Sequence, residues 1–235
     1  AIRHSHEFRC GSNLDRGMDR CELACMTTTK IDPLPATLFD RLDNAPDLMF
    51  YQAPRFVAHI DEPTIDALTN FYREILFDGA DVLDLMSSWI SHLPEEPALG
   101  RVAGLGMNEP ELAANPRLDD RTVHDLNTDP VLPYTSDTFD FVFIAVSIQY
   151  LVRPIEVFNE IARVLRPGGQ VDVATSHRCF PTKAIRAFRE KSPKDRMLLI
   201  AEYIRQTSMF EEPDMLDRSP QDADPLWLIC GTLSI

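Results

Sequence analysis

The sequence predicts an α/β fold in which helices cover both faces of a mostly parallel β-sheet. Two observations predict this fold. Short and almost wholly apolar runs alternate with segments whose apolar residues recur every three to four positions, and strands that are covered on both faces read as such runs. The chain has 235 residues, of which 44% are hydrophobic, which is enough for one domain with a modest extension.

Residues 1–30 are expected to lie outside this fold, as a poorly ordered or non-native N-terminal arm. Three of the five cysteines lie in this arm, namely Cys10, Cys21 and Cys25. No complete zinc-ligand pattern accompanies them, so we expect no metal site. The arm has no apolar core of a secretory signal and is too acidic for a transit peptide. Met26 is a candidate initiator.

Residues 31–78 are predicted to form an N-terminal helical lid or extension. Prolines interrupt residues 31–60, and a helical pattern follows them. Asp61 is placed to cap that helix, and Pro63 falls in its first turn. The apolar stripe of the helix consists of Ile65, Leu68, Phe71, Tyr72, Ile75 and Leu76.

Residues 79–235 are predicted to form the main domain. Its expected strands are residues 81–85, 101–105, 121–125, 139–146, 170–175 and 226–230. Its expected helices are residues 154–165, 182–190 and 194–206. Pro154 suits a first helical turn, and Pro167-Gly168-Gly169 ends that helix. Because strands and helices alternate, the strands are expected to run parallel.

Ligands of such sheets bind at the carboxyl ends of the strands. No glycine occurs between residues 80 and 99, so the first strand lacks a pyrophosphate-binding loop, which argues against a nicotinamide oxidoreductase. Ser87 and Ser88 stand there instead, and their hydroxyls are expected to cap a following helix. The formal net charge of −14 argues against nucleic acid and membranes as partners. No run of about 18 apolar residues is present, and we expect a cytoplasmic or organelle-stroma protein.

Five sequence motifs follow one another in a specific order. They are Val82-Leu-Asp-Leu85, Val102-Ala-Gly-Leu105, the turn at Asp125, Leu132-Pro-Tyr-Thr-Ser-Asp-Thr-Phe-Asp-Phe-Val142 and Val164-Leu-Arg-Pro-Gly-Gly169. Over about residues 81–175 this order resembles the class I S-adenosylmethionine-dependent methyltransferases, and in particular those of type 11. Within them the chain looks most like a little-characterised branch whose first loop reads like Leu85-Met-Ser-Ser-Trp-Ile-Ser-His-Leu-Pro94.

The resemblance implies a Rossmann-like sheet of seven strands, the last of which, residues 226–230, is antiparallel. It also implies S-adenosyl-L-methionine as the cofactor, lying across the ends of strands one to four. The residues that it assigns to the cofactor are Asp84, Met86, Ser87, Ser88, Gly106, Met107, Asn108, Asp125, Leu126, Val146 and Ser147. Two departures stand out. Met86, Ser88 and Ile90 replace the usual glycines, and Gly106 replaces the usual ribose-binding carboxylate.

The acceptor is expected to be a small molecule that cannot be identified from the sequence, and neither can the oligomeric state. His177 and Tyr150 are the candidate catalytic residues, and His177 is preferred as a base because imidazole titrates near neutrality. Candidate substrate-binding residues are Tyr51, Arg55, Gln149 and Arg178, with His59 as a further polar group from the lid. The alternative is a degenerate protein of the same fold that binds the cofactor weakly or not at all and acts through protein contacts.

Overall fold

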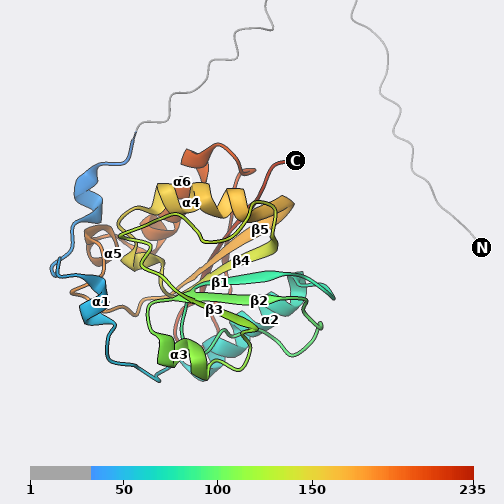
Figure 1. Cartoon of the computed structure of the whole chain (residues 1–235). Helices are drawn as coiled ribbons and strands as arrows, with labels where there is room; N and C mark the ends of the chain where they lie inside the picture. The colour runs from blue at the N-terminus through green and yellow to red at the C-terminus, as the bar shows by residue number, and fades with distance from the viewer. Residues whose placement is uncertain (1–32) are drawn as a thin grey trace, which may run out of the picture. The chain divides into compact units, whose positions relative to one another are not determined.

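A seven-stranded β-sheet forms the centre of the computed structural model, which describes residues 33–235 (Figure 1). The strands are β1 (Val82–Ser87), β2 (Val102–Gly106), β3 (Asp120–Val123), β4 (Phe139–Ala145), β5 (Leu165–Thr175), β6 (Asp214–Asp217) and β7 (Trp227–Thr232). They lie side by side in the order β3-β2-β1-β4-β5-β7-β6. Only β7 runs antiparallel to its neighbours. The predicted α/β fold with an antiparallel last strand is therefore confirmed.

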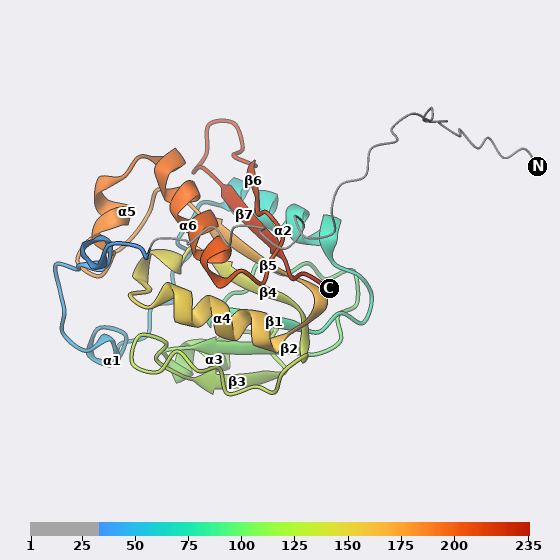
Figure 2. The ribbon, with the colours of Figure 1, turned by 90° about the horizontal axis from the view of Figure 1, so that it is seen from above.

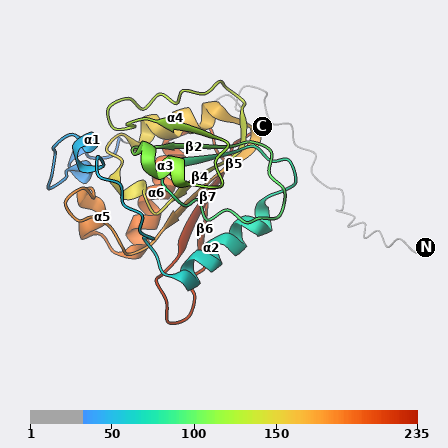
Figure 3. The same ribbon diagram turned by 60° about the horizontal axis from the view of Figure 1, so that its bottom comes forward.

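Helices cover both faces of the sheet. They are η2 (Ala36–Phe39), α1 (Asp47–Phe50), α2 (Glu62–Ile75), α3 (Glu109–Ala114), η3 (Ile148–Tyr150), α4 (Pro154–Val164), α5 (Arg186–Glu190) and α6 (Pro193–Thr207). Figures 1 and 2 together show α4 and α6 on one face, and Figure 3 shows α2 running along the other. Two buried apolar clusters correspond to these two layers.

Alternate residues along each strand build the two clusters. Leu83 and Leu85 belong to the cluster under α4 and α6, whereas Val82 belongs to the cluster under α2. On the α2 side, the ring of Tyr72 stacks on Phe143 with the ring centroids 4.1 Å apart. Because both faces of the central strands are covered, apolar residues are required at successive positions, which is why the strands were visible in the sequence.

The start of α2 matches its prediction. The Asp61 carboxylate accepts a hydrogen bond from the Thr64 main-chain N–H at 3.1 Å, which is the N-cap arrangement. Asp61 also accepts from the main-chain N–H of Asp224 at 2.8 Å, and its own N–H donates to the Asp224 carboxylate at 3.0 Å. These reciprocal bonds fasten the beginning of α2 to the segment that precedes β7.

Two elements differ clearly from their predicted limits, and strand β6 was not predicted. The helix expected over 182–190 is confined to α5, because the main-chain N–H groups of Ile185 and Arg186 donate to the oxygens of Gln149 at 3.0 Å and Asp40 at 2.7 Å and not to the preceding turn. The fifth strand begins at Leu165, which pairs with Phe139, and not at residue 170. The sequence pattern does not predict β6, because an exposed edge strand needs no apolar run.

The helix expected after β1 is absent, and residues 88–101 are not helical. The two serine hydroxyls bind side-chain carboxylates and do not cap a helix. Ser87 donates to Asp84 Oδ2 at 2.5 Å, and Ser88 donates to Glu111 Oε2 at 2.6 Å. Pro94 further disfavours a helix here, because proline lacks the N–H that a helix interior uses. The capping prediction was wrong.

Residues 33–235 form one compact unit. The division between a lid over residues 31–78 and a main domain over 79–235 stays a prediction. The predicted arm of residues 1–30, with its three cysteines, lies outside the residues that the structure describes. Among residues 33–235, no helix combines the length and the apolar character that a bilayer crossing demands.

Candidate functional site

A cavity of about 320 Å³ opens at the carboxyl ends of β1, β2 and β4. Its wall is made by the segments that follow β1 to β5, together with residues from the stretch 47–59. A cavity of this size falls within the range that small ligands occupy. It lies where ligands bind in open α/β sheets.

The structure brings together at this cavity every residue that the sequence assigned to the cofactor. The wall contains Asp84, Met86, Ser87, Ser88, Gly106, Met107, Asn108, Asp125, Leu126, Val146 and Ser147. Their roles in binding stay predictions. Met86 and Trp89, the bulky residues of the first loop, both lie in the wall, and the cavity remains open beside them.

Asp84 is a buried carboxylate of the wall. Its side chain is 3% exposed, and Oδ2 accepts hydrogen bonds from Ser87 Oγ at 2.5 Å and from Ser91 Oγ at 2.6 Å. Burial raises the pKa of Asp84 to about 6, although the two hydroxyls act in the opposite direction. At neutral pH this carboxylate is therefore charged, at a cost in stability, and it can attract a cationic ligand group.

Gly106 stands where the resemblance implies an acidic residue, and its surroundings explain why a glycine is found there. A Cβ atom at this position would collide with the main-chain oxygen of Ser87. Ser87 is paired with Gly106 in the sheet, across an irregularity in the register of β1. No side chain fits between the two strands there, so glycine is required by the close approach of two backbones.

Asn108 begins α3 and fastens the N-terminal segment to it. Its Oδ1 accepts from the Glu111 main-chain N–H at 3.0 Å, and its Nδ2 donates to the main-chain oxygens of Tyr51 at 2.8 Å and Gln52 at 3.2 Å. The amide is thus engaged by protein groups. It holds residues 51–52 over the cavity.

Glu111 is a wall residue that sequence reasoning missed. Its Oε1 accepts from the main-chain N–H of Arg55 at 2.7 Å, and its Oε2 accepts from Ser88 Oγ at 2.6 Å. A signal for it existed, because Asn108 followed three residues later by Glu111 is a pattern of helix starts. Glu111 joins the first loop, α3 and the N-terminal segment.

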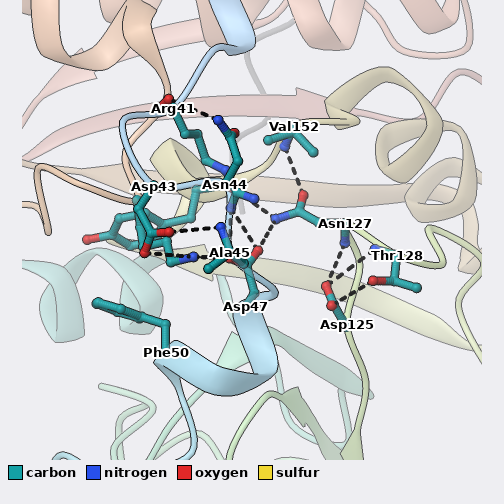
Figure 4. A network of polar contacts seen from close by, with 12 residues as sticks. Arg41, Asp43, Asn44, Ala45, Asp47, Phe50, Asp125, Asn127, Thr128 and Val152 are labelled. Atoms are coloured by element: carbon teal, nitrogen blue, oxygen red, sulfur yellow. Dashed lines mark hydrogen bonds and ion pairs between the residues drawn. The ribbon is translucent and has the colours of Figure 1, made fainter.

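Asp125 lines the cavity and also caps its own turn. Its carboxylate accepts from the main-chain N–H of Asn127 at 3.0 Å and from Thr128 Oγ1 at 2.8 Å (Figure 4). Asn127 extends this loop toward α1, since its Nδ2 donates to Asp47 Oδ2 at 2.8 Å, and its Oδ1 accepts from the Val152 N–H at 2.8 Å. The loop after β3 is therefore fixed from two sides.

Asp47, at the start of α1, sits in a buried network of charges (Figure 4). Its carboxylate accepts two hydrogen bonds from Arg41 Nη1 at 2.8 Å, and Lys183 Nζ lies 3.1 Å from Oδ1. Burial raises the pKa of Asp47, but the bonds from Arg41, Asn127 and Lys183 outweigh burial and hold the pKa below its ordinary value. Lys183 itself is fully buried. The network holds α1 against the cavity.

Aromatic rings form a further part of the wall. Tyr150 and Phe180 stack with their centroids 5.9 Å apart, and the Phe180 main-chain N–H donates to the Tyr150 hydroxyl at 2.8 Å. Burial raises the pKa of Tyr150 to about 12, so the phenol keeps its proton at neutral pH. Tyr150 therefore offers the cavity a rigid and uncharged wall, and its predicted catalytic role stays a prediction.

His177 and Gln149 are not among the wall residues. The side chain of His177 is 52% exposed, and its Nε2 lies 3.6 Å from Asp224 Oδ1. Gln149 is buried and donates to the main-chain oxygen of Val146 at 2.8 Å. The expectation that both face the acceptor is corrected, because the chain turns after β5 so that His177 faces Asp224. Arg178 does line the cavity, with its Nε 2.7 Å from Asp224 Oδ2.

His59 is the imidazole that the structure places in the wall near the aromatic rings. Its ring meets Phe180 edge to face, with the centroids 5.5 Å apart. Burial lowers the pKa of His59, so the ring is neutral at physiological pH and can accept a proton. His92, also in the wall, has a pKa lowered by burial to about 4.

Three wall residues adopt a backbone conformation that favours glycine, namely Met86 with φ of 61°, His92 with φ of 55° and Val146 with φ of 50°. For a β-branched residue such as Val146 this conformation is a rare one, costing on the order of 1–3 kcal/mol. Met86 therefore has a glycine-like backbone at a position where the resemblance implies a glycine, but it carries a bulky side chain.

Comparisons with known proteins agree with this architecture. Residues 87–173 match the family model of a methyltransferase domain. A stretch of 57 residues is 40% identical to methyltransferase GfsG of Streptomyces halstedii and covers 24% of this chain and 20% of that one. A stretch of 78 residues is 38% identical to demethylmenaquinone methyltransferase of Halalkalibacterium halodurans and covers 31% of each chain.

A solved structure shows the same fold at low sequence identity. It is a putative S-adenosylmethionine-dependent methyltransferase from Listeria monocytogenes, with a TM-score of 0.54, 10% identity, and coverage of 74% of this chain and 100% of that one. Residues 87–173 thus match a methyltransferase domain, and the described part of the chain shares the fold of this neighbour, as the motifs indicated. The matched stretches cover about a fifth and a third of the lengths of the two curated relatives.

Proposed function

We propose that this chain is an S-adenosylmethionine-dependent methyltransferase that acts on a small-molecule acceptor. The observation that carries the proposal is the cavity at the carboxyl ends of β1, β2 and β4, whose wall contains all the residues assigned to the cofactor. The matched methyltransferase domain over residues 87–173 supports the same activity.

Three features of the wall suit this cofactor. Asp84 presents a carboxylate that is charged at neutral pH and can attract the ammonium group of a methionine moiety. Leu126 follows Asp125 in the loop after β3, so an apolar surface lies beside a hydrogen-bond acceptor, as an adenine ring requires. The hydroxyl of Ser147 is buried and has no hydrogen-bond partner among residues 33–235, so it is free to bind a ligand.

When bound, S-adenosylmethionine supplies a methyl group carried by a positively charged sulfur. The chemistry it would supply is an in-line displacement, in which a lone pair of the acceptor would take the methyl carbon and the electrons of the broken carbon–sulfur bond would stay on sulfur. The protein contributes alignment and a pocket from which water is excluded. Where the acceptor must lose a proton, the neutral imidazole of His59 is placed in the wall to receive it.

Calorimetric titration of the full chain with S-adenosylmethionine and with S-adenosylhomocysteine tests the proposal. We expect both to bind in the micromolar range and to compete with each other. NADH serves as the control ligand, because a response to NADH alone would indicate an oxidoreductase. Absence of binding by both sulfur compounds up to millimolar concentration would refute the proposal and favour a degenerate protein that acts through protein contacts.

A further inference from the structure

Arg55 lies in the cavity wall among aromatic rings. The guanidinium carbon is 4.5 Å from the centroid of the Phe50 ring, 5.5 Å from that of Phe180 and 5.9 Å from that of Tyr51. Nη2 donates to the main-chain oxygen of Phe50 at 2.8 Å. These contacts fix the direction of the side chain, because a guanidinium packs flat against aromatic faces.

The charge of Arg55 has no counter-charge within the described part of the chain. Its Nη1 is buried and without a hydrogen-bond partner there. Glu111 is the neighbouring carboxylate, but Glu111 accepts from the main-chain N–H of Arg55 and from Ser88, and makes no ion pair with the guanidinium. Arg55 is half-buried, and holding a cation partly away from water without an anion is costly. A ligand that brings an anion would remove this cost.

Two other charged residues of the wall are compensated by protein groups. Arg178 is paired with Asp224 at 2.7 Å. Asp47 is paired with Arg41 at 2.8 Å and with Lys183 at 3.1 Å. Arg55 is thus distinguished from Arg178, the second arginine of the wall, by the lack of a carboxylate partner among residues 33–235.

The guanidinium of Arg55 packs on one side of the cavity. Its aromatic neighbour Phe180 follows β5, and Tyr150, which stacks on Phe180, follows β4. The residues predicted to hold the adenine, Asp125 and Leu126, follow β3, at the opposite edge of the sheet order. The guanidinium therefore lies away from the predicted adenine end, while the main-chain N–H of Arg55 is bound by Glu111, which also holds Ser88 of the first loop.

From this geometry we infer that the acceptor is a planar carboxylic acid whose carboxylate binds Arg55. The inference rests on the proposed methyltransferase function. The carboxylate pairs with Nη1, and the planar body packs against the rings of Tyr51, Tyr150 and Phe180, which line the same cavity. The site selects against neutral analogues, because they would leave the guanidinium without a counter-charge.

Paired probes test this assignment on the full chain. The probes are 4-hydroxybenzoate, 4-hydroxycinnamate and indole-3-carboxylate, each measured beside its own primary amide by calorimetry, with and without saturating S-adenosylhomocysteine. We expect at least one acid to bind about tenfold or more tightly than its amide. Arg55→Gln is expected to abolish that preference. Arg186→Gln, which changes an exposed arginine paired with Glu190, is the matched control and is expected to keep it.

Each outcome of the titrations decides the assignment. The assignment is overturned if acids and amides bind equally well or if no probe binds. It is also overturned if the Arg55→Gln variant keeps the preference for acids. A third arm compares S-adenosylhomocysteine with 5′-methylthioadenosine, which lacks the amino-acid carboxylate. If Arg55→Gln weakens the binding of S-adenosylhomocysteine but not that of 5′-methylthioadenosine or of the acid probes, Arg55 serves the cofactor and the acceptor assignment is wrong.

The same experiment separates this inference from the proposed function. If S-adenosylhomocysteine fails to bind while acid binding still depends on Arg55, the anion site stands and the methyltransferase function fails. If S-adenosylhomocysteine binds while Arg55→Gln leaves acid binding unchanged, the function stands and the anion site fails. Thermal unfolding of Arg55→Gln and Arg186→Gln, measured in parallel, verifies that both variants are folded.

Discussion

Replacing Asp84 by asparagine is expected to stabilise the free protein while weakening its binding of ligand. Asp84 is 3% exposed, and burial raises its pKa to about 6 from the ordinary 3.8. At about 1.36 kcal/mol per pH unit this difference corresponds to about 3 kcal/mol. The folded protein must bear this cost at neutral pH, where the carboxylate is charged.

The sign of the pH dependence follows from the raised pKa. Between pH 3.8 and about 6 the folded protein holds the proton on Asp84 while the unfolded chain releases it. The free energy of unfolding of the wild type therefore falls as the pH rises through this window, and stays lowered above it. The Asp84→Asn variant lacks this loss, because its amide does not titrate. The stability advantage of Asp84→Asn over the wild type should grow from about pH 4 to about pH 6 and then level off.

The expected gain at about pH 7.5 is about 3 kcal/mol, because the pKa of about 6 already includes the opposing bonds from Ser87 and Ser91. For a chain of this size that gain corresponds to about 6–12 °C in the melting temperature. Urea unfolding at several pH values measures it. In parallel, S-adenosylhomocysteine binding is expected to weaken about tenfold or more, because the ammonium group loses a charged partner.

Asp172→Asn is the matched control. Asp172 is also fully buried in the sheet, in β5, and burial raises its pKa to about 6 as well, but Asp172 is not a residue of the cavity wall. We expect this variant to be stabilised at neutral pH and to bind S-adenosylhomocysteine as the wild type does. The reasoning is refuted if Asp84→Asn melts no higher than the wild type at neutral pH and if the stabilities of variant and wild type change equally with pH below about 6.

Three further predictions concern stability. Lys183→Met should lower the free energy of unfolding by about 3 kcal/mol, because Asp47 keeps only Arg41 as a cationic partner. Urea unfolding measures this change. A free energy of unfolding equal to that of the wild type within error would contradict the role of the network. Gly106→Ala should destabilise more than Gly104→Ala, because the added methyl meets the backbone in the first case and the movable Leu118 side chain in the second; equal melting temperatures would disprove this. Burial lowers the pKa of His92 to about 4, so the wild type should lose about 3 kcal/mol of stability as the pH falls from 6.5 toward 4. The His92→Asn variant should not show this loss. Acid unfolding curves of variant and wild type that coincide would count against this prediction.

Asp84 and His92 change the stability of the protein with pH in opposite directions, so the variants must be compared with each other. Asp84 lowers the stability of the wild type as the pH rises from 3.8 to about 6, whereas His92 raises it as the pH rises from about 4 to 6.5. The two effects overlap in the same window and partly cancel. The pH profile of the wild type alone therefore carries little information about either residue, while each variant isolates one of them.

The order of strands and helices was predictable because it depends on local periodicity. Strands that are covered on both faces must be apolar throughout, and helices that pack on a sheet repeat every three to four residues. The helix start at Asp61 was readable for the same reason, since its cap partner Thr64 lies three residues away. Elements without such a local requirement were missed, including the short α3 and the exposed strand β6.

The composition of the cavity wall was only partly predictable. Residues at strand ends converge because the strands are parallel, so Asp84, Asp125 and Val146 could be assigned to one cavity from their order alone. The position of Glu111 in the wall was not accessible in this way, and His59 was predicted only as a polar group of the lid. Both positions depend on contacts between segments far apart in the chain, such as the bond between Arg55 and Glu111, which are 56 residues apart.

The amino-acid sequence by itself determined the class of fold and the edge of the sheet at which the cavity opens, since both follow from hydrophobic periodicity and chain direction. The tertiary structure alone decided which groups are charged, buried or free at that edge. Ser87 binds Asp84 and not a helix end, Gly106 is dictated by a neighbouring backbone, and Arg55 is left without a counter-charge among residues 33–235. The physical reason is that solvation and hydrogen bonding depend on all the atoms that surround a group, and most of those atoms come from distant parts of the chain.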